Sequence, residues 1–209
     1  MLNEDYAIGD FRKDQLYNLV KFVVDQNYNR HPQNANIAHK SEEIEMLFNE
    51  EKSIFHDAYY TVAFNNNDEI VGSIRTMEWR VNGTLPIEKI FNIKILDFVD
   101  KEMRPAIWHI GRFALKKGYS NIELFKTMIF NAIEPICQDI HSVAFAECDI
   151  KLMRTLKKMG IDTEVIAEPV VYLGSTTVPI RMTGKTLSNY YFQNFIPSQS
   201  GLNNFKMVI

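Results

Sequence analysis

The sequence lacks the features that mark membrane, secreted or nucleic-acid-binding proteins. In its 209 residues no run approaches the ~20 uninterrupted apolar residues of a membrane-spanning helix. The opening stretch MLNEDYAIGDFRKD has neither the basic nor the apolar region of a signal peptide. The formal net charge of -3 gives no general attraction to nucleic acid. We therefore expect a cytoplasmic protein with no integral membrane segment and no nucleic-acid partner.

Cysteine is scarce as well. Cys137 and Cys148 lie in segments predicted as a helix and a strand, with no C-x-x-C spacing and no histidine ligand set nearby. We interpret both as reduced thiols in the core, and we expect no metal site.

The chain does contain enough apolar residues for one substantial core. Its hydrophobic content is 46%, and at this length one domain is the default expectation. We predict a single domain with a helical part over residues 1–56, a sheet core over 57–183 and a tail over 184–209 that the sequence does not place.

Helix and strand signals in the first half follow a regular order. Apolar residues at helical spacing predict one helix after Asp10 and a second after Ser41. Aromatic and β-branched residues then predict a hairpin of strands over 59–64 and 69–81, followed by a strand over 106–115. The stretch between 85 and 103 is expected to be short helix and loop.

In the second half, strands and helices alternate. Ser120 and Glu123 have the spacing of a capping box, which predicts a helix that runs to about His141 with an interruption at Pro135. A strand over 142–148 follows, and Asp149 and Gly160 mark the ends of the next helix. VIAEPVVYLG and TTVPIRMT predict two last strands. The fold class is therefore α/β (α+β).

Three segments of this order resemble one family. EIVGSIRT, with Gly72 and Arg75, and WHIGRFAL, with Arg112 and Phe113, resemble strands of the acyl-homoserine-lactone and N-acyl amino acid synthases. These synthases are a branch of the GNAT superfamily of acyltransferases. MRTLKKMGIDTEVIAEPVVYLGSTTVPI is similar to the late helix and final strands of that branch. The resemblance covers about residues 57–183 and implies a central mixed, mostly antiparallel sheet flanked by helices.

The resemblance has gaps at several functional positions. His109 stands where the lactone synthases have a glutamate, and no tryptophan precedes Trp79, although Asp57 is a candidate for one of their acidic positions. The loop KKGYSN has one glycine where ordinary acetyltransferases have a glycine-rich loop for coenzyme A. Leu156 stands where many of them have an acidic tyrosine.

The resemblance implies an N-acyltransferase. It would move a medium or long acyl group from a thioester of coenzyme A or acyl carrier protein to the amine of an amino acid or related metabolite. The thioester would be a cosubstrate, with no tightly bound cofactor. Two alternatives are an acetyl-coenzyme A-dependent N-acetyltransferase and a degenerate member that binds an acyl ligand or a protein partner without turnover.

The candidate catalytic residues are His109 and Glu147, either of which can take the proton of the amine. The alternatives are a strand histidine bonded to a carbonyl group and a glutamate paired with a lysine. Arg75 and Arg112 can bind the carboxylate of the acceptor or form structural ion pairs. Gly111 permits a β-bulge between His109 and Arg112.

The donor is expected to bind at the turn after the 106–115 strand, and Asp57 and Phe113 are further substrate-binding candidates. Exposed amide groups at a helix start can hold an anion, and cations nearby can meet phosphates or an acidic carrier protein; a solvated helix face is the alternative. The turn residues are Lys116, Lys117, Gly118, Tyr119, Ser120 and Asn121, and the further cations are Lys151, Arg154, Lys157 and Lys158. Five apolar residues either line a tunnel for the acyl chain or simply belong to the core: Phe113, Phe125, Met128, Ile129 and Phe130.

Overall fold

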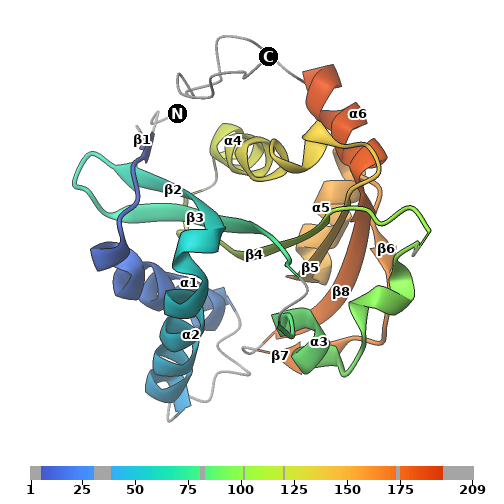
Figure 1. The fold of residues 1–209 in the computed structure, drawn as a ribbon. Coiled ribbons are helices and arrows are strands. Elements are labelled where there is room, and N and C mark those ends of the chain that lie inside the picture. Colours follow the sequence, from blue (N-terminus) through green and yellow to red (C-terminus); the bar gives the residue numbers. More distant parts are fainter. Residues whose placement is uncertain are drawn as a thin grey trace.

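A single sheet organises the fold (Figure 1). The computed structural model describes residues 6–30, 39–80, 83–100, 102–119, 121–172 and 175–194. Within them the strand order is β1-β2-β3-β4-β5-β8-β6, and β7 pairs with β8. The strands are β1 (Tyr6–Gly9), β2 (Ala58–Asn65), β3 (Ile70–Glu78), β4 (Ile107–Leu115), β5 (Val143–Asp149), β6 (Glu164–Val165), β7 (Val170–Tyr172) and β8 (Ser175–Thr183).

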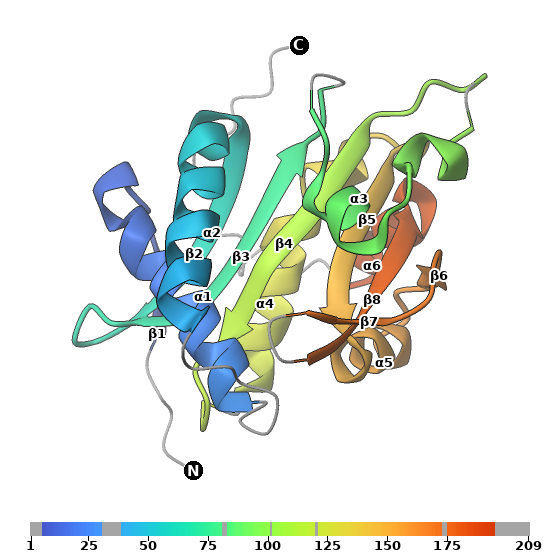
Figure 2. The same cartoon turned by 90° about the horizontal axis from the view of Figure 1, so that it is seen from below.

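Helices cover both faces of this sheet (Figures 1 and 2). They are α1 (Leu16–Arg30), α2 (Lys40–Ile54), α3 (Pro86–Phe91), α4 (Ile122–Ile133), α5 (Ile150–Lys158) and α6 (Gly184–Asn194). Successive side chains of β2 point to opposite faces of the sheet. Ala63 packs in the same cluster as α4, α5 and α6, whereas Val62 packs with α1. None of the described helices is long and apolar enough to cross a membrane.

The sheet is mixed and mostly antiparallel, as predicted. Of the described strand pairs, β4 and β5 run parallel and the others run antiparallel. The parallel pairing runs from Ile107 opposite Val143 to Ile110 opposite Ala146. Beyond this stretch, β4 continues to Leu115 and β5 to Asp149, but the two strands no longer pair with each other and they diverge (Figure 2). This divergence places an opening between two central strands.

The predicted bulge lies in β4. Arg75 pairs with Gly111 and Ser73 with Ala114, so Arg112 and its neighbour face a single residue of β3. The left-handed residue of the bulge is Arg112 (φ 56°), not the glycine, and Ser73 Oγ donates a hydrogen bond of 2.8 Å to its carbonyl. Gly111 is needed for another reason: a Cβ there would lie 2.9 Å from an Arg75 guanidinium nitrogen. The glycine therefore admits a charged side chain into the sheet.

The start and end of α4 differ from the prediction. Ser120 lies outside the described residues, and Asn121 caps the helix by accepting the amide hydrogens of Glu123 and Leu124. The helix ends at Ile133 and does not reach His141. Pro135 has no amide hydrogen for another helical bond, and a 3₁₀ turn over Ile136–Gln138 follows.

Other boundaries also needed correction. The first helix begins at Leu16 after a short 3₁₀ turn, β1 was not foreseen, and the segment VIAEPVVYLG is divided into β6 and β7. Part of the tail that the sequence did not place is α6. Its residues Leu187, Tyr190 and Tyr191 pack into the same cluster as α4.

We expect Gly184→Ala to lower the free energy of unfolding by about 1–3 kcal/mol. A Cβ at this first residue of α6 would lie 2.5 Å from the carbonyl oxygen of Asp139 and 3.0 Å from that of Ser142. Urea denaturation measures the change, with Gly83→Ala as the matched control because a Cβ there meets nothing within 4 Å. Equal losses in both variants would contradict close packing at the start of α6.

Candidate functional site

A cleft opens where β4 and β5 diverge. Its volume is about 780 Å³. The walls come from the bulged half of β4, the end of β5, helices α1 and α5, the start of α4, and strands β7 and β8. A narrow apolar cavity of about 40 Å³ lies next to it, and Phe113, Glu147, Cys148 and Leu152 line both.

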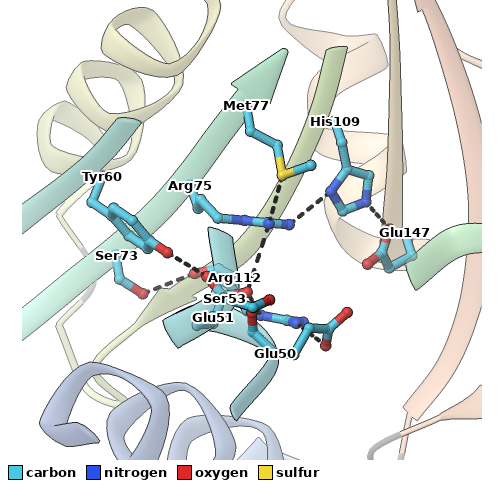
Figure 3. A network of polar contacts seen from close by, with 10 residues as sticks. All are labelled: Glu50, Glu51, Ser53, Tyr60, Ser73, Arg75, Met77, His109, Arg112 and Glu147. Carbon is cyan, nitrogen blue, oxygen red and sulfur yellow. Dashed lines mark hydrogen bonds and ion pairs between the residues drawn. The ribbon is translucent and has the colours of Figure 1, made fainter. Parts of the chain in front are cut away.

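A buried polar network crosses the sheet beside this cleft (Figure 3). At its centre, the Glu51 carboxylate of α2 accepts a hydrogen bond of 2.7 Å from Arg112 Nε and one of 2.6 Å from the Tyr60 hydroxyl. Glu51 Oε1 also lies 3.6 Å from Arg75 NH1, and neither side chain is exposed. Burying these charges is tolerable because they are paired.

His109 continues the network from Arg75 to Glu147. Arg75 NH2 lies 2.7 Å from His109 Nδ1, and His109 Nε2 lies 2.7 Å from Glu147 Oε2. A guanidinium can only donate, so Nδ1 must accept and the ring proton sits on Nε2, from which it is donated to Glu147. The imidazole is therefore neutral, with both nitrogens engaged and no exposed surface. His109 lines neither cavity, and it connects Arg75 to Glu147.

Glu147 and Arg112 are the members of the network that line the cleft, and Glu147 carries an oxygen open to it. The Glu147 side chain is 7% exposed, and its Oε1 has no hydrogen-bond partner among the described residues. Burial by itself raises the pKa of Glu147, but contact with His109 and the charges of Arg112 and Arg75 outweigh burial and lower the pKa. The carboxylate is therefore ionised at neutral pH and can accept a proton or hold a cation.

Both arginines are engaged by carboxylates. Arg112 NH2 donates to Glu50 Oε2 at 2.8 Å, in addition to the bond from its Nε to Glu51. Burial opposes the charge of Arg112, but Glu51 and Glu50 raise its pKa above the usual value. Burial likewise raises the pKa of Glu51, and Arg75 and Arg112 overcome this and lower it. The structural ion pairs that the sequence analysis gave as one alternative for Arg75 and Arg112 are therefore present.

Three of the predicted donor-binding residues line the cleft. These are Lys117, Tyr119 and Asn121. Lys117 is held by bonds from its backbone amide to Gln26 Oε1 and from its Nζ to the Asn29 carbonyl. Lys116 instead pairs with Glu69 at 2.9 Å, and Gly118 (φ 89°) forms the turn without lining the cleft. Ser120 lies outside the described residues.

The remaining candidates divide between the cavities and the core. Phe113 and Phe125 line the cleft and meet edge to face at 5.6 Å, and Ile129 lines the apolar cavity. Met128 is fully buried in the core, and Phe130 stacks on Tyr191. Asp57 is exposed in the turn before β2 and lines neither cavity.

Glu51 and Tyr172 contribute to the site but were not predicted from the sequence. Glu51 follows Ile44, Leu47 and Phe48 on the apolar stripe of α2, so its charge on a buried face was a usable signal. Tyr172 of β7 lines the cleft, and nothing local in its sequence indicates this. Within the described residues no group of histidine, cysteine and acidic side chains can hold a metal ion.

Searches with this chain found no matching family model and no matching curated protein. Solved structures do match. FeeM, an N-acyl amino acid synthase from uncultured soil microbes, is 13% identical with a TM-score of 0.58, over 90% of this chain and 95% of its own. The AHL synthase LasI is 16% identical with a TM-score of 0.54, over 90% and 94%.

A third match extends the likeness to acetyltransferases. The PaiA N-acetyltransferase of Thermoplasma acidophilum, solved in complex with coenzyme A, is 11% identical with a TM-score of 0.56. The match covers 86% of this chain and 99% of that one. The chain therefore has the GNAT-like fold that the sequence motifs implied.

We expect Glu51→Gln to lower the free energy of unfolding by about 3–5 kcal/mol at neutral pH, because two buried guanidinium groups lose their shared counter-charge. The Glu51 pKa is lowered in the folded state, so its contribution is fully present above the ordinary carboxyl pKa of ~4.3 and is lost as the pH falls further. Urea denaturation between acidic and neutral pH measures both effects.

The matched control is Glu45→Gln, the same change at an exposed position of the same helix. It should shift the unfolding free energy by less than about 0.5 kcal/mol. A deficit in Glu51→Gln that stays constant through the acid range would contradict the assignment.

Proposed function

We propose that this chain is an N-acyltransferase, which moves an acyl group from a thioester to a primary amine. One observation carries the proposal. A buried, ionised carboxylate, that of Glu147, presents an unpaired oxygen to a cleft that opens between two diverging central strands and borders an apolar cavity. This arrangement supplies a base, room for a carrier and an apolar site for the acyl chain.

The reaction exchanges one bond for another. The amine nitrogen forms a bond to the thioester carbonyl carbon, and the bond from that carbon to sulfur breaks. The amine attacks as the neutral base, and its nitrogen loses a proton to Glu147 as the amide forms. The departing thiolate takes up that proton from Glu147, so the products are an amide and a free thiol and the carboxylate is restored. His109 donates to Glu147 Oε2, which leaves Oε1 directed to the nitrogen.

Cations beside the cleft support an anionic carrier. Lys117 and Lys151 line the cleft, and Arg154, Lys157 and Lys158 are exposed on the same helix, α5, as Lys151. The described α5 has no acidic residue between them. Both coenzyme A, through its phosphates, and an acyl carrier protein, through an acidic surface, fit this charge.

The apolar cavity supports an acyl chain longer than acetyl. It extends from Gly111 and Phe113 past Ile129 to Leu187, between the sheet and helices α4, α5 and α6. Its small volume favours a second candidate, transfer of acetyl from acetyl-coenzyme A. Transfer of a longer acyl chain requires the side chains that line this cavity to repack around the chain, whereas transfer of acetyl does not.

We expect thiol release from octanoyl- and dodecanoyl-coenzyme A to exceed that from acetyl-coenzyme A with a mixture of primary amines as acceptors. Glu147→Gln should lower kcat by at least ~100-fold and leave KM for the donor unchanged, because the amide cannot take the proton. Colorimetric thiol release and mass spectrometry of the amide measure the reaction.

Glu45→Gln is the control for the Glu147 variant, with thermal melting to verify that each protein is folded. A preference for acetyl-coenzyme A would favour the second candidate. Binding of acyl thioesters without any turnover would contradict both and leave the degenerate binding module.

We expect the double change Lys151→Glu and Arg154→Glu to raise KM for acyl-coenzyme A by ~tenfold or more and to weaken its dependence on salt. kcat should change less than about twofold, because neither residue lies in the network around Glu147. Lys89→Glu with Lys94→Glu, an equal charge change at exposed sites away from the cleft, is the control. An equal rise of KM in both proteins would show that α5 has no particular part in donor binding.

A further inference from the structure

We infer that the acceptor is a primary amine that carries no carboxylate beside its nitrogen, and that Glu50 enforces this choice. The inference rests on the proposed function and narrows its acceptor class. An amino acid needs a free cationic group to receive its carboxylate, whereas a simple amine needs a carboxylate for its ammonium group. Beside Glu147 the cleft wall offers the carboxylate, whereas Arg112, the cation at that wall, is already paired with Glu50 and Glu51.

Arg112 is the cation at the catalytic wall of the cleft, and it is not free. Its side chain is 5% exposed, and Nε and NH2 both donate to glutamates at 2.7 and 2.8 Å. An acceptor carboxylate would have to displace Glu50 to make a bidentate contact through both terminal nitrogens of Arg112. Displacement would leave the Glu50 charge beside the incoming carboxylate and Glu147, and like charges at such distances repel.

Arg75 is unavailable for a different reason. Its side chain has no exposed surface and lines neither cavity. It lies 2.7 Å from His109 Nδ1 and 3.6 Å from Glu51 Oε1, behind the residues that form the cleft wall. Arg75 therefore offers no exposed donor group for the role of acceptor anchor that was expected of both arginines.

The charge balance of the network favours a cation. Three carboxylates, those of Glu50, Glu51 and Glu147, face the two guanidinium groups of Arg75 and Arg112, while the neutral ring of His109 adds nothing. One negative charge is left over. Two described atoms of the network are buried without a partner, Arg75 Nε and Glu147 Oε1. Glu147 is the one in the cleft lining, so the excess charge is presented where an ammonium group would arrive.

The other side chains of the cleft do not reverse this sign. Burial and nearby carboxylates raise the pKa of Tyr172 to about 12, so its hydroxyl is neutral at physiological pH. In the described cleft lining, the cations other than Arg112 are Lys117 and Lys151, which are both exposed. Lys117 Nζ is bonded to the Asn29 carbonyl of α1, and both lysines belong to the carrier side.

Glu50 is the specificity-determining residue in this arrangement. Its side chain is 27% exposed, and its Oε2 accepts from the guanidinium nitrogen of Arg112 that Glu51 does not bind. Removing the Glu50 carboxylate would uncover that nitrogen without disturbing the buried Glu51 pair. A charge-assisted bond to a substrate carboxylate would then become available.

The test compares amines with the amino acids from which they differ by one carboxylate. Phenethylamine is paired with phenylalanine and isoamylamine with leucine, using octanoyl-coenzyme A as donor and the full-length protein. We expect kcat/KM to favour the amine of each pair by at least ~tenfold, because the amino acid carboxylate finds no partner. Thiol release and mass spectrometry of the amide are the readouts.

A gain-of-function variant makes the test specific. In Glu50→Ala the ratio of kcat/KM for amine over amino acid should fall by at least ~tenfold, as Arg112 NH2 becomes free to bind the carboxylate. Glu45→Ala, the same change at an exposed position of α2, should leave the ratio unchanged.

The outcomes test the acceptor class and the proposed N-acyl transfer separately. Preference of the unaltered protein for the amino acids, or an unchanged ratio in Glu50→Ala, would overturn the acceptor class while N-acyl transfer stands. Absence of turnover with every acceptor would overturn both. Preference for the amines with a lowered ratio in Glu50→Ala supports the inference.

Discussion

The Glu51 carboxylate, buried between two arginines, is the interaction on which the rest of the site depends. It brings a negative charge from α2 to the sheet face at the point where Arg75 and Arg112 point inward. Neither arginine could be buried there without a counter-charge, given the cost of desolvating a guanidinium group. Arg75 in turn contacts His109, and His109 contacts Glu147, so the position of the proposed base depends on a residue of the N-terminal helices.

The backbone of β4 is adapted to this network. Arg112 adopts a left-handed conformation that costs an ordinary residue about 1–3 kcal/mol, and the bonds to Glu50, Glu51 and Ser73 offset that cost. The bulge also ends the register that would keep β4 beside β5. The same local distortion thus orients a charged side chain and marks the place where the central strands separate.

Much of the fold was predictable because local signals agreed with it. The hairpin of β2 and β3, the alternation of β4, α4, β5 and α5, and the cap at Asp149 follow from apolar periodicity and from side chains that bond to free amide groups. β1 was missed, because a strand of four residues carries little pattern, and the one strand predicted over VIAEPVVYLG is divided into the short strands β6 and β7. The start of α4 was displaced, because Ser120 and Asn121 are both good caps and sequence alone did not rank them.

The site was less predictable, because its meaning lies in contacts between distant residues. His109, Glu147, Arg75 and Arg112 were selected by residue type and by resemblance, yet whether each was free or engaged depended on partners elsewhere in the chain. Glu51 engages both arginines, and it belongs to a helix outside the segments that carried the resemblance.

The network also ties the chemistry to the completion of folding. The bonds that lead from Glu51 to Arg112, from Arg75 to His109 and from His109 to Glu147 join residues 61, 34 and 38 positions apart. Contacts of such long range form late, after much of the chain entropy has been lost. An incompletely folded chain therefore does not hold the Glu147 carboxylate beside the gap between β4 and β5. Under the proposed function, a thioester would meet the oriented carboxylate only in the finished protein.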